Sequence, residues 1–146
     1  MRPQVRERRR TRGILDTSVV IELERIDPVD LPIEFAVSAV TLAELAAGPH
    51  ATSDPAERAS RQDRLQRAEA TFVPLPVDGR VARAYGRVYA AVAAAGRKAR
   101  GRRALDLLIA ATALASDLPL YTRNPADFAE LVSLIEIVTV EPSRGA

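Results

Sequence analysis

Four acidic residues stand in sequence settings that a structural role alone explains poorly. They are Asp16, Glu44, Asp106 and Asp127. The first three lie among aliphatic residues, where a carboxylate loses hydration and needs a partner. Several converging carboxylates are suited to a hard divalent cation, which prefers oxygen ligands. The pattern therefore predicts a metal-dependent enzyme that acts on phosphate esters.

Two of these acids also have a local explanation as helix caps. Asp16 precedes Thr17 and Ser18 and a run of aliphatic residues, so it can be an ordinary helix N-cap. Thr41 and Glu44 have the spacing of a capping box, in which the glutamate accepts from a backbone amide near the start of the helix. For both acids the sequence leaves capping and chemistry open.

Asp106 is harder to explain structurally, because it interrupts an apolar helical pattern. The residues three, four, seven and eight positions later are all apolar, namely Ile109, Ala110, Ala113 and Leu114. Asp106 is thus expected to point into the buried stripe, unless it caps a helix that begins at Leu107. A buried carboxylate requires compensation, and this indicates a functional role.

The segment after residue 123 offers two candidates for a fourth ligand. Asn124 can be an N-cap, Pro125 fits the first helical position, and Asp127 suits the first turn, where the helix dipole favours negative charge. Either Asn124 or Asp127 can instead be a ligand of a metal ion. The sequence alone does not choose between them.

Composition excludes several other kinds of catalytic site. The 146 residues include no cysteine, which excludes thiolate zinc sites, iron–sulfur clusters and a cysteine nucleophile. The single histidine, His50, excludes a pair of histidines acting as acid and base without metal. Carboxylates and a metal must therefore supply any hydrolytic chemistry.

Basic residues concentrate in two places. Residues 1–12 hold six arginines and one glutamate, and they are expected to form a disordered tail rather than a secretory signal, because they lack an apolar region. Residues 97–103 form a basic loop just before Asp106, and its cations are candidates for contacts with phosphate groups. They are Arg97, Lys98, Arg100, Arg102 and Arg103.

Short apolar strands alternate with helices along the chain. Strands are predicted at residues 13–16, 35–37, 72–76, 118–121 and 135–140. Helices are predicted at 18–25, 41–47, 54–69, 78–95, 104–115 and 125–131. This alternation predicts one α/β domain over residues 13–141, with a parallel sheet covered on both faces and a short tail at 142–146. Such sheets bind ligands beyond the carboxyl ends of their strands, where these acids would meet.

Taken together, four segments resemble the PIN-domain ribonucleases, specifically the VapC-type toxins of bacterial toxin–antitoxin pairs. The segments are residues 14–21, 37–45, 104–113 and 118–128, in the order and spacing of that family. The resemblance implies a three-layer α/β/α sandwich with a central parallel sheet. It also implies a cytoplasmic ribonuclease that hydrolyses RNA phosphodiester bonds with Mg²⁺ or Mn²⁺.

Within that resemblance, Asp16, Glu44 and Asp106 are the catalytic and metal-binding residues, and Thr17 and Ser18 orient the site. The fourth acidic position aligns best with Asn124, where many members have aspartate, and Asp127 can supply the missing carboxylate. The resemblance further implies a cognate antitoxin protein and a homodimer or toxin–antitoxin hetero-oligomer, with no membrane partner.

Two other functions fit the sequence less well. A phosphatase of the haloacid-dehalogenase type needs a second aspartate two residues after the first, and Ser18 stands there. A non-catalytic nucleic-acid-binding or regulatory PIN-like module with a decayed site is the alternative, in which Asn124 is the first sign of decay. Metal-dependent RNA cleavage by the purified protein separates that alternative from the enzyme.

Overall fold

A four-stranded parallel sheet lies at the centre of the part of the chain that the structure, a computed structural model, describes (residues 9–143). The strands are β1 (Arg12–Leu15), β2 (Glu34–Val37), β3 (Leu120–Thr122) and β4 (Ile137–Thr139). Their order is β2-β1-β3-β4, and each neighbouring pair is parallel. The predicted parallel sheet is confirmed.

Helices cover both faces of this sheet, because its strands are apolar on both sides. Ile14 and Leu15 are neighbours in β1, so their side chains point to opposite faces. Ile14 belongs to one buried cluster with Val88 and Leu107, whereas Leu15 belongs to another with Ala68. These clusters join the sheet to α4 (Gly79–Ala94) and α5 (Arg102–Ser116) on one side, and to α1 (Thr17–Ile21) and α3 (Pro55–Thr71) on the other. The three-layer α/β/α architecture is confirmed.

The remaining helical elements are α2 (Ala39–Ala47) and four short 3-10 segments. These are η1 (Leu23–Arg25), η2 (Pro28–Asp30), η3 (Gly48–Ala51) and η4 (Pro125–Leu131). Predicted caps are found at α3 and α4, where the side chains of Asp54 and Asp78 accept from backbone amides in the first turn. The helix predicted at residues 18–25 is interrupted at Glu22, after which the chain continues as η1.

The strand predicted at residues 72–76 is wrong. Leu75 makes only an isolated parallel bridge with Ser38. Pro74 and Pro76 flank that residue and have no amide hydrogen, so a ladder of hydrogen bonds cannot extend in either direction. The apolar composition of the segment reflects packing, since Phe72 is buried in the cluster that contains Leu15.

The end of the predicted N-terminal tail is ordered against the sheet. The guanidinium group of Arg9 donates to the carbonyls of Leu31 and Pro32, Arg10 pairs with Glu136, and β1 begins at Arg12. The prediction of disorder is therefore wrong for residues 9–12, whereas residues 1–8 lie outside the described residues. In the predicted C-terminal tail, the Ser143 amide donates to the Arg25 carbonyl, and residues 144–146 likewise lie outside.

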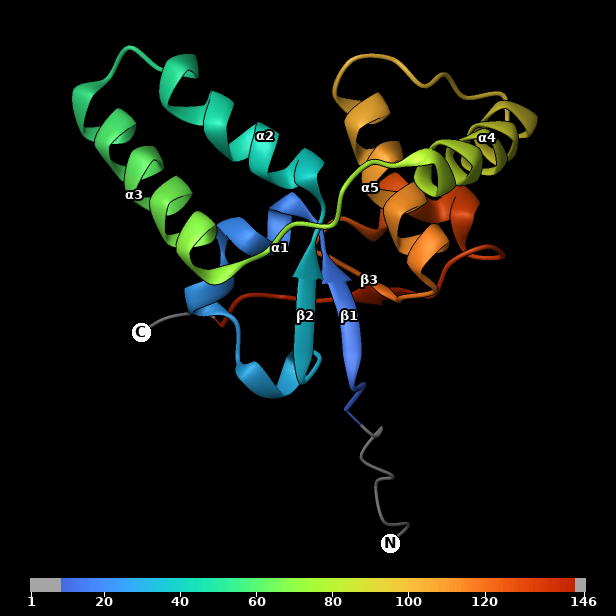
Figure 1. Ribbon diagram of the computed structural model, residues 1–146, viewed down its shortest axis with the longest axis horizontal. Helices are drawn as coiled ribbons and strands as arrows, with labels where there is room; N and C mark the ends of the chain where they lie inside the picture. The colour runs from blue at the N-terminus through green and yellow to red at the C-terminus, as the bar shows by residue number, and fades with distance from the viewer. Residues whose placement is uncertain (1–8, 144–146) are drawn as a thin grey trace, which may run out of the picture.

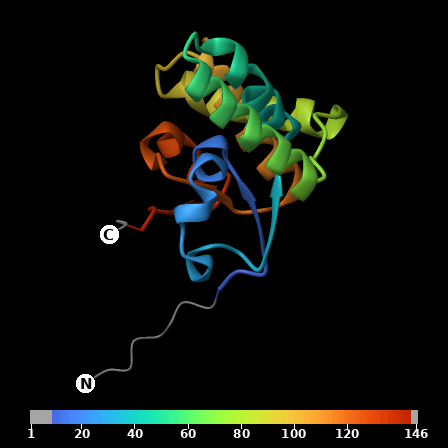
Figure 2. The same cartoon turned by 90° about the vertical axis from the view of Figure 1, so that its left-hand side faces the viewer.

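The strands point toward the place where the helices on the two sides of the sheet come together. Figure 1 shows the arrowheads of β1 and β2 beneath the gap between the α2–α3 pair and the α4–α5 pair. Figure 2 shows the same strands rising toward the helical part of the molecule. The segments that follow the strands, which carry the candidate acids, are therefore brought to one edge. No helix among residues 9–143 has the length and apolar character needed to cross a membrane.

Candidate active site

Asp16 stands at the junction between β1 and α1. Its Oδ1 atom accepts hydrogen bonds from the Ser18 hydroxyl at 2.6 Å and from the Val19 amide at 3.1 Å. Asp16 is thus the predicted N-cap of α1. Only 4 % of the residue is exposed, and this burial raises the pKa of its carboxyl, while hydrogen bonds from Ser18 and Thr122 oppose the rise. Capping does not exclude metal binding, because a carboxylate has two oxygens.

Glu44 is not part of a capping box. Helix α2 begins at Ala39, and its N-cap is Ser38, whose hydroxyl accepts from the Val40 amide at 3.1 Å. Thr41 therefore lies inside the helix rather than at its cap, and Glu44 lies near the middle. The carboxylate of Glu44 accepts instead from the Thr17 hydroxyl at 2.8 Å. The capping interpretation is wrong because the helix starts two residues earlier than the predicted residue 41.

Asp106 lies in the second turn of α5, which begins at Arg102, so it is not an N-cap either. The side chain is half-buried, whereas Ile109, Ala110 and Ala113 on the same helix are fully buried. Asp106 thus lies at the edge of the core rather than inside it. Burial raises the pKa of Asp106 to about 6, with further increases from the negative charges of Glu44, Asp127 and Asp16, and an opposing effect from Arg102. The charges of three carboxylates from different elements thus act on Asp106.

Asn124 and Asp127 both lie at the carboxyl end of β3 and are both exposed. Asn124 occupies the N-cap position of η4, but its side chain makes no capping hydrogen bond. The negative charge that acts on Asp106 from this segment belongs to Asp127. The capping explanation for the Asn124 side chain is therefore wrong, and Asp127 is the residue of the pair with a carboxylate coupled to the cluster.

The arrangement of acids at the ends of parallel strands agrees with a family-level comparison. The family model described as PIN domain matches residues 13–133. The chain belongs to the PIN-domain family. Among curated proteins, Ribonuclease VapC5 of Mycobacterium tuberculosis (strain ATCC 25618 / H37Rv) is 38 % identical over 133 residues, which are 88 % of this chain and 95 % of that protein. Ribonuclease VapC4 of the same strain is 34 % identical over 132 residues, covering 88 % and 97 %.

A solved structure is similar to this PIN domain over almost its whole length. It is that of VapBC-5 from Mycobacterium tuberculosis, described as a member of the VapBC family of toxin–antitoxin systems. The matched chain is 39 % identical, the TM-score is 0.78, and the match covers 89 % of this chain and 99 % of that one. The resemblance on which the predicted fold rested is thereby confirmed.

The basic loop of this PIN domain divides into two groups of side chains. Arg97 and Arg103 both pair with Glu130, at 2.8 Å and 3.1 Å. Lys98, Arg100 and Arg102 are exposed, and none of their side chains makes a hydrogen bond or an ion pair with another residue of 9–143. These three cations remain accessible to an external phosphate, whereas the first two are held within the protein.

Sequence reasoning missed the contacts of two threonines near the acids. Thr41 places its hydroxyl oxygen 3.1 Å from that of Thr17, and Thr122 hydrogen-bonds to Asp16. Both threonines are completely buried. Thr122 could have been found from the strand register, since Leu15 pairs with Tyr121 and the next residues of the two strands are therefore adjacent. The contact of Thr41 could not have been found, because the predicted helix began at residue 41, whereas Thr41 lies inside α2.

The donor set fits a hard divalent cation in chemistry, although the side chains do not yet form a complete cage. Within residues 9–143, no three acidic or histidine side chains converge closely enough to hold a metal ion by themselves. Burial and repulsion from the other three carboxylates nevertheless raise the pKa of Asp106, and the donor atoms of all four side chains are oxygens. A divalent cation relieves such repulsion, and Mg²⁺ keeps several waters in place of protein ligands.

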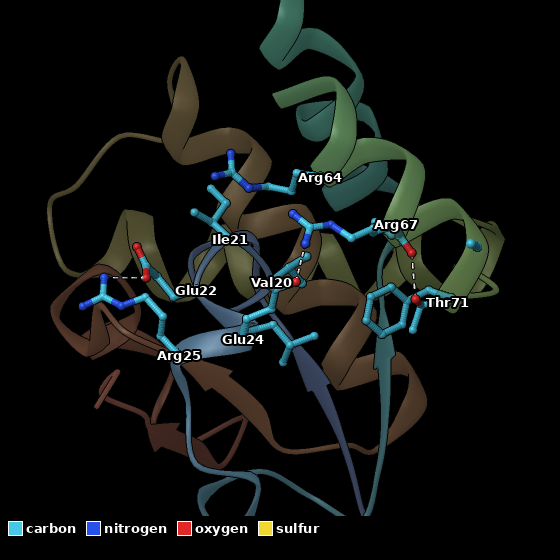
Figure 3. A pocket seen from close by; sticks show the side chains of 12 residues that line it. Val20, Ile21, Glu22, Glu24, Arg25, Arg64, Arg67 and Thr71 are labelled. Atoms are coloured by element: carbon cyan, nitrogen blue, oxygen red, sulfur yellow. Dashed lines mark hydrogen bonds and ion pairs between the residues drawn. The ribbon is translucent and has the colours of Figure 1, made fainter. Parts of the chain in front are cut away.

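A groove of about 370 Å³ lies apart from these acids, between the α1–η1 segment and the second half of α3. Figure 3 shows Val20 and Ile21 in it, with the ion pairs Glu22–Arg25 and Glu24–Arg67 and the side chain of Arg64 around them. None of the four candidate acids lines this groove.

Proposed function

We propose that this PIN domain is a metal-dependent ribonuclease that hydrolyses RNA phosphodiester bonds and acts as the toxin of a toxin–antitoxin pair. The observation that carries the proposal is that the negative charges of Glu44, Asp127 and Asp16 all act on the half-buried carboxylate of Asp106. A structural role gives no reason to gather four carboxylates, whereas a cation needs them. The names of the similar proteins, Ribonuclease VapC5 and Ribonuclease VapC4, support RNA as the substrate.

The four carboxylates would hold Mg²⁺ or Mn²⁺, directly or through waters. A bound cation of this kind lowers the pKa of a water and neutralises charge on the phosphate group that is attacked. The Ser18 hydroxyl, which donates to Asp16 and accepts from the Arg123 amide at 3.1 Å, fixes one carboxylate. Thr17 fixes Glu44 in the same way. Orientation of this kind matters because misplaced ligands lower metal affinity and activity.

Positive charge for the RNA backbone would come from the exposed part of the basic loop. Lys98, Arg100 and Arg102 are free to neutralise phosphates on either side of the scissile bond. The charge of Arg102 also acts on Asp106, which supports a role for this cation close to the acids. Arg97 and Arg103, which the sequence grouped with them, are held by Glu130 and would contact phosphate only after that pairing breaks.

A protein partner is part of the proposal, because an uncontrolled ribonuclease harms the cell that makes it. The similar VapBC-5 structure is described as belonging to toxin–antitoxin systems, which supports a cognate antitoxin for this chain and assembly into a homodimer or hetero-oligomer. Carboxylates without metal create a negative potential that a basic side chain of the partner can occupy.

Induced expression tests the proposal in cells. The wild-type chain should arrest growth, and sequencing of RNA ends should show new cleavage sites, because the cluster is intact. Asp16→Asn should do neither, since it removes one carboxylate while asparagine can keep the N-cap. Harmless expression of soluble wild-type protein, with no new RNA ends, contradicts the proposal and favours the non-catalytic alternative.

A further inference from the structure

Glu130 is a nearly buried carboxylate outside the four acids, and its role is not explained by packing. Only 9 % of its side chain is exposed, although it carries a charge. Its Oε1 atom lies 2.8 Å from Arg97 Nε, and its Oε2 atom accepts from Arg103 Nη2 at 3.1 Å. Two arginines from separate elements therefore converge on the two oxygens of one glutamate.

These contacts fasten three elements to one another. Glu130 belongs to η4, Arg103 to the first turn of α5, and Arg97 to the segment between α4 and α5. That segment is bounded by Gly96 and Gly101, whose φ angles of 76° and 58° favour glycine. The basic loop thus turns sharply at both ends, and Arg97 is the side chain that ties it to η4.

The Arg103–Glu130 ion pair lies close in sequence to two of the candidate acids. Arg103 lies three residues before Asp106 on α5, and Glu130 lies three residues after Asp127 on η4. Arg103 and Asp106 share a face of α5, because they lie three residues apart on that helix, whereas η4 is kinked at Phe128, between Asp127 and Glu130. The attractive pair Arg103–Glu130 therefore joins the same two elements, α5 and η4, that carry the carboxylates of Asp106 and Asp127.

Repulsion between Asp106 and Asp127 tends to separate α5 from η4 when no cation lies between them. Apolar contacts between these elements also exist, since Phe128, Leu131 and Leu107 share a buried cluster. Apolar contacts are not directional, however, and they fix the registration of two elements less strictly than a hydrogen-bonded ion pair does. The arrangement also leaves Arg103 Nε buried without a hydrogen-bond partner, which is unfavourable for stability alone.

We propose that Glu130 is a positioning residue, which through Arg103 holds the carboxylate of Asp127 beside that of Asp106 and so keeps the fourth acid in the metal site. Arg97 fastens the basic loop to the carboxylate of Glu130, and this contact fixes the position of the loop relative to the acids. This role deepens the proposed ribonuclease function and rests on it. It also accounts for how a chain with Asn124 at the aligned position can keep a fourth acidic ligand.

Titration of Mn²⁺ into the full chain by calorimetry tests this role without relying on activity. Glu130→Gln keeps the size of the side chain but loses the charge that pairs with both arginines. The Kd for Mn²⁺ should rise about tenfold or more, which is typical for loss of a group that orients metal ligands. Glu57→Gln, which breaks the exposed Glu57–Arg61 ion pair on α3, is the matched control and should leave the Kd unchanged.

Kinetics on a short RNA add a second readout. Glu130→Gln should lower kcat, because the carboxylate of Asp127 is no longer held beside that of Asp106. Arg103→Gln should reproduce the rise in the Mn²⁺ Kd, and the double variant should be no worse than either single variant, since the two residues act as one unit. Arg97→Gln should change the Kd less, because it joins the loop rather than α5 to η4.

The outcomes separate this inference from the proposed function. If the wild-type chain neither binds Mn²⁺ nor cleaves RNA, the proposed function fails. If the wild type does both and Glu130→Gln binds Mn²⁺ as Glu57→Gln does, the positioning role is overturned. Should Glu130→Gln fail to fold, Glu130→Asp decides: it keeps the charge with a shorter reach, and a wild-type Kd in that folded variant together with a wild-type Kd in Arg103→Gln overturns the role.

Discussion

The hydroxyl of Thr17 donates a hydrogen bond of 2.8 Å to the carboxylate of Glu44. This contact joins the first residue of α1 to the middle of α2, and so it connects the segments that follow β1 and β2. A threonine hydroxyl has one proton to donate. When Thr17 donates it to Glu44, the buried Thr41 hydroxyl, whose oxygen is 3.1 Å away, can donate its own proton to the Thr17 oxygen. Glu44 is thereby held by side chains rather than by the helix backbone.

Glu44→Gln is expected to lower ribonuclease activity while leaving the fold intact. Glutamine can still accept from Thr17, but it brings no charge to the metal. The loss in kcat should be about 10- to 100-fold, as for other changes close to a metal site. Steady-state cleavage of a short RNA in Mg²⁺, alongside a thermal melt, measures both effects. Glu69→Gln on the exposed face of α3 serves as the control, and equal activity in both variants would refute a role for Glu44 in the reaction.

Stability of the metal-free protein should depend on pH through Asp106. The folded-state pKa of Asp106 is about 6, above the ordinary value near 3.8, so the folded chain binds the proton more tightly than the unfolded chain. The free energy of unfolding should therefore fall as pH rises from about 4 to about 6, and then level off. Urea denaturation in EDTA across this range measures the slope.

Asp106→Asn should remove that contribution to the pH dependence. Near neutral pH the variant should be more stable than the wild type by about 1 kcal/mol, because asparagine has no charge to desolvate or to repel the other carboxylates. The gain is limited because water reaches half of the side chain and screens the repulsion. It should also be inactive. A variant less stable than the wild type in EDTA at pH 7.5 would instead make Asp106 a structural partner. Asp63→Asn, on exposed α3, is the control.

Asp127 and Asn124 are distinguished by their effects on metal affinity. Asp127→Asn should weaken Mn²⁺ binding about tenfold, because it removes a carboxylate that acts on Asp106. Asn124→Asp should strengthen binding, since it adds a carboxylate at the same strand end. Calorimetric titration of both variants decides the matter. Unchanged affinity in both would leave the two residues with no part in the metal site.

The architecture could be predicted from the sequence because its determinants are local. Short aliphatic runs such as Ile14–Leu15 bury both faces of a parallel sheet, and Asp16, Asp54 and Asp78 cap the helices that the sequence assigned to them. The strand predicted at residues 72–76 failed because apolar composition outweighed Pro74 and Pro76 in the prediction. Prolines on both sides of Leu75 leave too few amides for a strand.

The site could be predicted only in part, since its relationships join residues far apart in the chain. The four acids were identified from their settings, and the charges of Glu44, Asp127 and Asp16 act on Asp106. The role of Glu44 could not be separated from capping without knowing that α2 begins at Ala39. Arg97 and Arg103 pair with Glu130, which lies about 30 residues further along the sequence, and no local pattern indicates this pairing.

Metal dependence of RNA cleavage by the purified chain tests the central claim most directly. The protein should cleave RNA in Mg²⁺ or Mn²⁺, lose that activity in EDTA, and regain it when the cation is added in excess, because one histidine and no cysteine leave carboxylates to do the work. Asp106→Asn purified in parallel should be inactive throughout and so exclude a contaminating nuclease. Cleavage that persists undiminished in EDTA, or that Asp106→Asn retains, contradicts the account.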